Sequence, residues 1–302
     1  MHRLVSLLCL SLFFTATCAG AQALSWRDIL ARGTPPAPDQ VLSYGAQATQ
    51  TAQLWLPKTA PGVPLPVAVL IHGGCWLSDY PGPELVAYLA DALRNKGMAV
   101  WSITYRRVGL KENVQGGGYP HTFDDVGAAL DYLRVLAPRH GLDLDRIVVT
   151  GHSAGGHLAL WAASRPRLPH DSPLYKAAAL PVRAAVSIAG LPDLAYALDA
   201  SAHACGTGTV AKLVDLDKRG KQAYRDTSPQ EMLPLGVAQS MIAGVYDGIA
   251  PPVHGWRYRS QAQAKGEQVA LLNLEDAGHF ELIAPWTPAG KAVVEAIAGA
   301  VR

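Results

Sequence analysis

The sequence has few charged residues and no strong excess of either sign. Charged residues make up 17% of the 302, and 26 Lys and Arg against 24 Asp and Glu leave a formal net charge of +2. A chain this close to neutral has no electrostatic field that would gather nucleic acid or anionic lipid. Its hydrophobic content of 49% excludes a largely disordered chain.

Motifs of nucleotide and metal chemistry are also missing. The sequence contains no P-loop and no dinucleotide-binding fingerprint, and its ten histidines show no metal-ligand spacing. We therefore expect no metal and no other cofactor. The partner should be a small molecule rather than nucleic acid, and the function must be sought in local motifs.

Long apolar runs are confined to the N-terminus. Met1-His2-Arg3 precedes an almost unbroken apolar run, Leu4 to Phe14, which is followed by the A-x-A cleavage pattern Ala19-Gly20-Ala21. About 11 apolar residues are too few to span a bilayer and are typical of a secretory signal peptide. We expect removal of residues 1–21, with Ala21-Gln22-Ala23 as a second cleavage option. The mature protein should be exported, periplasmic or secreted, and have no membrane span.

Cysteine is scarce. Of the four cysteines, Cys9 and Cys18 would be removed with the signal peptide, which leaves Cys75 and Cys205. Two cysteines are an even number in an oxidising compartment, so a pair is possible.

From about residue 51 the chain alternates between short apolar strands and helices. Val67 to Ile71 is a continuous apolar run, as in a strand buried on both faces, whereas Asp124 to Ala137 has apolar residues at helical spacing. Repeated alternation predicts a mostly parallel sheet with helices on both faces. We expect residues 22–50 to be irregular, 51–302 to be one α/β domain, and 190–237 to be a lid-like excursion.

The pentapeptide Gly151-His152-Ser153-Ala154-Gly155 lies between a predicted strand and a predicted helix. In that context G-x-S-x-G predicts a sharp turn that exposes the serine hydroxyl above the sheet edge. The N-terminus of the following helix offers free N–H groups to a developing oxyanion. Ser153 is therefore the predicted nucleophile.

A second motif, His72-Gly73-Gly74-Cys75-Trp76, directly follows the strand at 67–71. Glycines at this place let the backbone approach a substrate and turn its N–H groups toward the serine. We expect the N–H groups of Gly73, Gly74 and Ala154 to form the oxyanion hole.

A serine hydroxyl needs a base to take its proton and an acid to orient that base. His279 lies just beyond the last predicted strand, and Asp247 follows the strand at 240–244. In parallel-sheet folds with a G-x-S-x-G turn, the nucleophile, the acid and the base follow one another along the chain in this order, which here is Ser153, Asp247, His279. Asp193 is the rival acid, and Asp276 is better explained as a residue of a solvated turn.

These motifs resemble the α/β-hydrolase superfamily, in particular esterases with an H-G-G-x-W oxyanion loop and a G-H-S-A-G-G-H elbow. That group includes acetyl and feruloyl esterases and overlaps with hormone-sensitive-lipase-like and kynurenine-formamidase-like branches. The similarity runs from about Leu54 to the end of the chain and includes Tyr105-Arg106 and Thr227-Ser228-Pro229. The resemblance implies an α/β-hydrolase fold and a serine hydrolase activity.

The chain departs from this group at Cys75, where relatives often carry Gly or Tyr. Cys75 and Trp76 are therefore candidates for the pocket wall. In this architecture the 190–237 excursion overhangs the same face, so a Cys75–Cys205 disulfide that fastens it over the site is one hypothesis. The alternative is a pair of buried thiols that pack as small hydrophobic side chains.

We thus expect an exported carboxylesterase that acts on short-acyl esters through Ser153, Asp247 and His279. An arylformamidase with the same catalytic groups is the enzymatic alternative, and a non-catalytic binding module that kept the fold is a further one.

Overall fold

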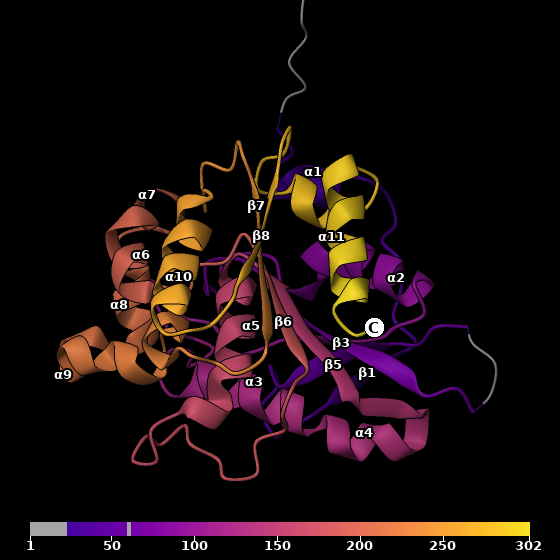
Figure 1. Ribbon diagram of the computed structural model, residues 1–302, viewed down its shortest axis with the longest axis horizontal. Coiled ribbons are helices and arrows are strands. Elements are labelled where there is room, and N and C mark those ends of the chain that lie inside the picture. The colour runs from indigo at the N-terminus through magenta and orange to yellow at the C-terminus, as the bar shows by residue number, and fades with distance from the viewer. Residues whose placement is uncertain (1–22, 59–61) are drawn as a thin grey trace, which may run out of the picture.

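The protein is described here by a computed structural model that covers residues 23–58 and 62–302. An eight-stranded sheet in the order β1-β2-β4-β3-β5-β6-β7-β8 runs through these residues (Figure 1). β1 pairs antiparallel with β2, and β2 pairs antiparallel with β4, whereas the pairs from β4 to β8 are parallel. The strands are β1 (Gln40–Ser43), β2 (Thr51–Trp55), β3 (Leu65–Ile71), β4 (Ala99–Ile103), β5 (Leu142–His152), β6 (Ala184–Ile188), β7 (Ala238–Gly244) and β8 (Ala270–Leu274).

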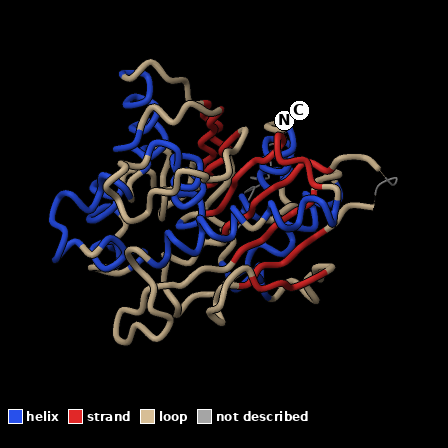
Figure 2. Tube along the Cα trace, turned by 90° about the horizontal axis from the view of Figure 1, so that it is seen from below, coloured by secondary structure: helices blue, strands red, loops and turns tan. Residues whose placement is uncertain are grey.

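Helices cover both faces of the sheet, and Figure 2 shows the strands crossing the middle of the molecule. Near one face, α2 packs against α11, and on the other face α5 packs against β5 and α3 (Figure 1). The α-helices outside the excursion are α1 (Trp26–Leu30), α2 (Ala87–Asn95), α3 (His121–Asp131), α4 (Leu133–His140), α5 (Ala154–Ser164), α10 (Val253–Ala264) and α11 (Pro288–Gly299).

The apolar runs of the sequence explain this arrangement. All seven residues of β3 except Pro66 are buried, as are all five residues of β4 and of β6. A strand with apolar side chains on both sides must be covered on both faces, which a parallel sheet with crossover helices provides. The parallel strands β3, β5, β6, β7 and β8 therefore end at the same edge, and this edge carries the residues of interest.

The excursion between β6 and β7 is built from short helices. It contains α6 (Leu194–Ala200), α7 (Ala202–Cys205), α8 (Thr209–Val214) and α9 (Leu216–Arg219), followed by the 3₁₀ helices η3 (Gly220–Asp226) and η4 (Pro229–Met232). In Figure 1 this segment lies beside α10, at the side of the molecule away from β1.

Two expectations about secondary structure are wrong. Residues 22–50 are not wholly irregular, because they contain α1 and β1. Ser25 begins α1 with a capping box, in which its hydroxyl accepts a bond from the Asp28 N–H while the Asp28 side chain accepts one from the Ser25 N–H. In addition, the helix predicted at 124–137 is two helices, α3 and α4, that meet at Tyr132. With five and four residues, α1 and β1 are too short to leave a periodic signal in the sequence.

The predicted signal peptide, residues 1–21, lies outside the described residues. Within residues 23–58 and 62–302, every helix is too short or too polar to cross a membrane.

Candidate active site

Ser153 occupies a strained turn between β5 and α5. Its φ of 57° and ψ of −119° lie in a region that side chains rarely adopt. The turn brings backbones into close contact. A Cβ on Gly151 would lie 2.3 Å from the Gly155 carbonyl oxygen, and a Cβ on Gly155 would lie 2.0 Å from that of Ile71. Only glycine fits at these two positions, which explains the G-x-S-x-G spacing.

His279 and Asp247 form a buried pair. The Nδ1 atom of His279 lies 2.7 Å from Oδ2 of Asp247, and Oδ1 of Asp247 accepts bonds of 2.8 Å from the N–H groups of Ile249 and Ala250. Burial alone would raise the pKa of Asp247, but the hydrogen bond and charge of His279 and these two N–H groups lower it overall. A carboxylate so placed fixes the imidazole with its Nε2 directed away from the acid.

The rival acid is used elsewhere. Asp193 begins α6, where its Oδ1 accepts the Tyr196 N–H at 3.1 Å and its Oδ2 accepts a bond of 2.7 Å from Gln230. Asp193, the alternative candidate for the acid of the triad, is therefore not supported by the structure. Asp276 is exposed, with a φ of 32° in the turn before His279.

The loop after β3 approaches Ser153 closely. A Cβ on Gly73 would lie 2.9 Å from the His152 carbonyl oxygen and 3.2 Å from Cβ of Ser153. The loop thus needs glycine at this point. Ala154 is the first residue of α5, so its N–H has no partner within the helix. Gly73 and Ala154 thus lie next to Ser153, and Gly74 lines the same pocket as Ser153.

His72 anchors the start of this loop. Its ring is fully buried and stacks on Tyr105 at 4.6 Å between centroids, and the Tyr105 hydroxyl donates to the His72 carbonyl oxygen at 3.1 Å. Burial, and then the charge of Arg107, lower the pKa of His72 to about 3. His72 is therefore a neutral structural residue beside the site.

Ser153 and His279 line the same pocket, which has a volume of about 180 Å³. The described hydrogen bonds do not include one from Ser153 to His279, and such contacts commonly tighten only when substrate binds. The lining is mostly apolar. It consists of Trp26, Gly74, Cys75, Tyr80, Pro81, Leu85, His152, Ser153, Ala204, Ile249, His279 and Phe280.

The two pocket candidates from the sequence have different outcomes. Cys75 lines the pocket and forms a disulfide with Cys205, across 130 residues of chain. Trp76, in contrast, is fully buried and does not line the pocket, so that expectation is wrong. Its φ of 57° turns the side chain into the protein, where the indole N–H donates to Nδ1 of His157 at 3.2 Å.

The excursion contributes to the site through α7. Ala204 lines the pocket, and the next residue, Cys205, is bonded to Cys75. The preceding residue, His203, has its Nε2 2.8 Å from the carbonyl oxygen of Gly248, which directly follows Asp247. The helix α7 thus contacts both the oxyanion loop and the loop of the acid.

Sequence reasoning missed eight of the twelve pocket residues, which are Trp26, Tyr80, Pro81, Leu85, His152, Ala204, Ile249 and Phe280. Trp26 belongs to the segment expected to be irregular, and Ala204 gives no signal in a sequence. It also missed the contact of His152, whose Nε2 donates to the His279 carbonyl oxygen at 3.0 Å. The position of His152 next to Ser153 was the available signal, but its partner is 127 residues away.

Comparison with known proteins gives a family match. A family model described as BD-FAE matches residues 53–237, from β2 to the residue before β7. The match includes the oxyanion loop, Ser153 and the excursion, and it ends before Asp247 and His279.

The chain is also similar to two named proteins of Mycobacterium tuberculosis. It is 27% identical to "Esterase LipC" over 252 residues, which are 80% of this chain and 59% of the relative. It is 31% identical to "Probable carboxylic ester hydrolase LipM" over 169 residues, 54% of this chain and 37% of the relative. This chain therefore spans less than two thirds of either relative's length.

Solved structures resemble the whole described fold. Esterase B from Lactobacillus Rhamnosis has a TM-score of 0.71 at 20% identity, over 90% of this chain and 91% of that one. A truncated carbohydrate esterase from gut microbiota has a TM-score of 0.68 at 20% identity, over 89% and 99% of the two chains. With the sheet order, these likenesses confirm the expected α/β-hydrolase fold.

Proposed function

The chain belongs to the BD-FAE family of α/β-hydrolases, and from this premise we propose that it hydrolyses carboxylic esters with small acyl groups, using Ser153 as nucleophile. One observation carries the proposal most directly. His279, which is hydrogen-bonded to the buried Asp247, lines the same pocket as the strained Ser153. The esterase names of the relatives agree with this reaction.

Acylation begins with the proton of Ser153. Nε2 of His279 takes that proton while Oγ of Ser153 attacks the ester carbonyl carbon. The imidazolium that forms is stabilised by the carboxylate of Asp247, which stays ionised because its pKa is lowered. His279 then gives the proton to the leaving alcohol oxygen, and an acyl-enzyme remains.

The negative charge that develops on the carbonyl oxygen needs hydrogen-bond donors. In our proposal the N–H groups of Gly73, Gly74 and Ala154 supply them, and the N-terminus of α5 adds a favourable dipole. In deacylation His279 takes a proton from water, which attacks the acyl carbon, and the proton is then returned to Ser153.

The size of the pocket supports a preference for small acyl groups. Its volume of about 180 Å³ is below the roughly 300–1,000 Å³ of sites for drug-sized ligands. Ala204 and Ile249 are part of its apolar wall. A short acyl chain can be desolvated there, whereas a long one would have to extend past these side chains.

Hydrolysis of p-nitrophenyl esters from acetate to decanoate tests the proposal, with Ser153→Ala as control. We expect activity that falls steeply beyond butyrate, and a loss of several orders of magnitude in the variant. Wild-type activity in Ser153→Ala would refute the nucleophile. Absence of ester hydrolysis, with Ser153 still labelled by a fluorophosphonate, would favour a formamide or another amide as substrate.

We also propose that the protein is exported. The Cys75–Cys205 disulfide supports this, because disulfides persist in oxidising compartments. N-terminal sequencing of protein recovered from a periplasmic or culture fraction is the test. A mature N-terminus at residue 22 or 24 is expected, and intact Met1 in the cytoplasmic fraction alone would refute export.

A further inference from the structure

The proposed oxyanion hole has two halves that come from separate parts of the chain. Gly73 and Gly74 lie in the loop after β3, and Ala154 begins α5. Donors in such a hole must be held within about 0.5 Å of their working positions. Some contact must therefore set the distance between the loop and the helix.

The loop needs support because its backbone is strained. Three consecutive residues have positive φ angles: Gly74 at 96°, Cys75 at 53° and Trp76 at 57°. Glycine tolerates this region, but a bulky residue such as tryptophan rarely adopts it. Each such non-glycine residue persists only where its surroundings determine the conformation.

Trp76 makes a side-chain hydrogen bond that joins the two halves, in addition to the backbone packing of Gly155 against Ile71. Its indole N–H donates to Nδ1 of His157 at 3.2 Å, and the two rings meet edge to face at 5.3 Å between centroids. Both side chains are fully buried. His157 lies on the first turn of α5, three residues after Ala154. The bond thus connects the strained loop to the helix that carries Ser153 and Ala154.

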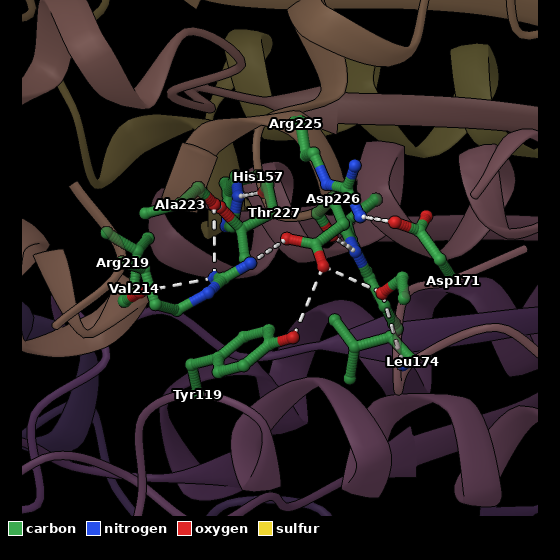
Figure 3. A network of polar contacts seen from close by, with 12 residues as sticks. Tyr119, His157, Asp171, Leu174, Val214, Arg219, Ala223, Arg225, Asp226 and Thr227 are labelled. Atoms are coloured by element: carbon green, nitrogen blue, oxygen red, sulfur yellow. Dashed lines mark hydrogen bonds and ion pairs between the residues drawn. The ribbon is translucent and has the colours of Figure 1, made fainter. Parts of the chain in front are cut away.

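The hydrogen bonds define the state of His157. An indole N–H can only donate, so Nδ1 must accept and Nε2 must carry the proton. That proton is donated to the Thr227 carbonyl oxygen at 2.8 Å (Figure 3). Burial lowers the pKa of His157 to about 4, although the bond to Thr227 partly opposes this. His157 is therefore neutral near pH 7.

The far side of His157 is also well anchored. Thr227 follows Asp226, whose buried carboxylate accepts bonds from Arg219 at 2.6 Å and Tyr119 at 3.3 Å (Figure 3). The same carboxylate accepts a bond of 2.7 Å from the Ser172 hydroxyl. The guanidinium of Arg219 also lies over the Tyr119 ring at 3.5 Å. The Thr227 carbonyl thus has a fixed position from which to orient the imidazole.

We propose that His157 is a positioning residue of the oxyanion hole, which acts through the Trp76 indole to set the loop of Gly73 and Gly74 relative to Ala154. The inference rests on the proposed ester hydrolysis. Neither residue touches the pocket, so the effect should be on the placement of the donors and not on binding of the substrate's ground state.

Paired substitutions separate the two bonds of His157. In His157→Asn the amide oxygen takes the place of Nδ1 and can accept the indole N–H. In His157→Gln the amide nitrogen takes the place of Nε2 and keeps only the bond to Thr227. With p-nitrophenyl butyrate we expect a roughly 10- to 100-fold lower kcat in His157→Gln, an unchanged KM and a smaller loss in His157→Asn.

A double-mutant cycle identifies the bond itself. Trp76→Phe removes the indole donor, and we expect Trp76→Phe/His157→Gln to be no slower than the slower single variant. Trp101→Phe is the matched control, because it also removes a buried indole bond, to the Ala129 carbonyl at 2.9 Å, and we expect it to keep kcat within about twofold.

Two results would overturn the inference: a kcat of His157→Gln equal to that of wild type, or additive losses in the cycle. NMR gives a readout that does not depend on turnover. The Nε1–H signal that Trp76→Phe removes should shift in His157→Gln and shift less in His157→Asn, and an unshifted signal would exclude the bond.

Failure of the proposed function would look different. Wild-type protein without Ser153-dependent ester hydrolysis refutes that function, and the rate of fluorophosphonate labelling of Ser153 would then replace kcat in the same comparison. If Ser153 is neither labelled nor needed for hydrolysis, both the function and this inference fall.

Discussion

Loss of the Cys75–Cys205 disulfide should lower the stability of the protein substantially. The bond closes a loop of 130 residues that contains β4, β5 and β6. In the chain-entropy account, a cross-link over a loop of this length stabilises the folded state by about 5 kcal/mol at 25 °C. With an unfolding entropy of roughly 2.1 cal/mol/K per residue, that amount corresponds to a decrease in Tm of about 8 °C for a domain of this size.

Calorimetry of oxidised and reduced wild-type protein measures this effect. Protein that is unfolded and refolded with reductant keeps both sulfur atoms and loses only the cross-link. The Cys75→Ala/Cys205→Ala variant should show the same decrease plus the loss of sulfur packing, and it should not respond to reductant.

The reasoning is refuted if reduced and oxidised wild-type protein unfold within about 2 °C of each other. Titration of denatured, unreduced protein is a separate check, because two free thiols would show that the bond does not form. At 25 °C we expect the reduced enzyme to stay active, since Trp76 and Tyr105 still anchor the oxyanion loop.

Three further predictions concern pH, the turn and the acid. Four buried histidines have pKa values lowered to about 3 or 4, and these are His72, His152, His157 and His254. Because the unfolded chain binds their protons near pH 6.5, each should cost about 2 kcal/mol of stability on going from pH 7 to pH 5. Urea unfolding at the two pH values checks this, and equal stability would contradict it. Gly155→Ala should yield little folded protein on expression, because its Cβ would lie 2.0 Å from the Ile71 carbonyl oxygen; a normally stable variant would show that the turn is misplaced. Asp247→Asn should keep the fold but lower kcat by roughly 10³- to 10⁴-fold, since its amide would donate to Nδ1 and force the wrong tautomer of His279; a loss below tenfold would exclude Asp247 as the acid.

Much of the fold could be predicted from the sequence for a local reason. The strands β3, β4 and β6 are continuous apolar runs, and a run with no polar side must be buried on both faces. The G-x-S-x-G pattern is also local, and Gly151 packs against Gly155 within the turn, but the contact of Gly155 with the Ile71 carbonyl oxygen of β3 joins segments far apart in the sequence. The candidate site residues Ser153, Asp247 and His279 followed from the order of such elements along the chain.

The sequence by itself thus determined the sheet, the turn and the residue types at the site, because hydrophobic periodicity and short motifs such as G-x-S-x-G are properties of a few neighbouring residues. Only the tertiary structure decided which distant residues meet. The acid role of Asp193 lost support through its contacts in α6, Trp76 faces His157 and not the pocket, and Cys75 reaches Cys205 across 130 residues. Such contacts form because loops from distant parts of the chain meet at the same edge of the sheet. A pattern of a few neighbouring residues carries no information about which distant loops will meet there.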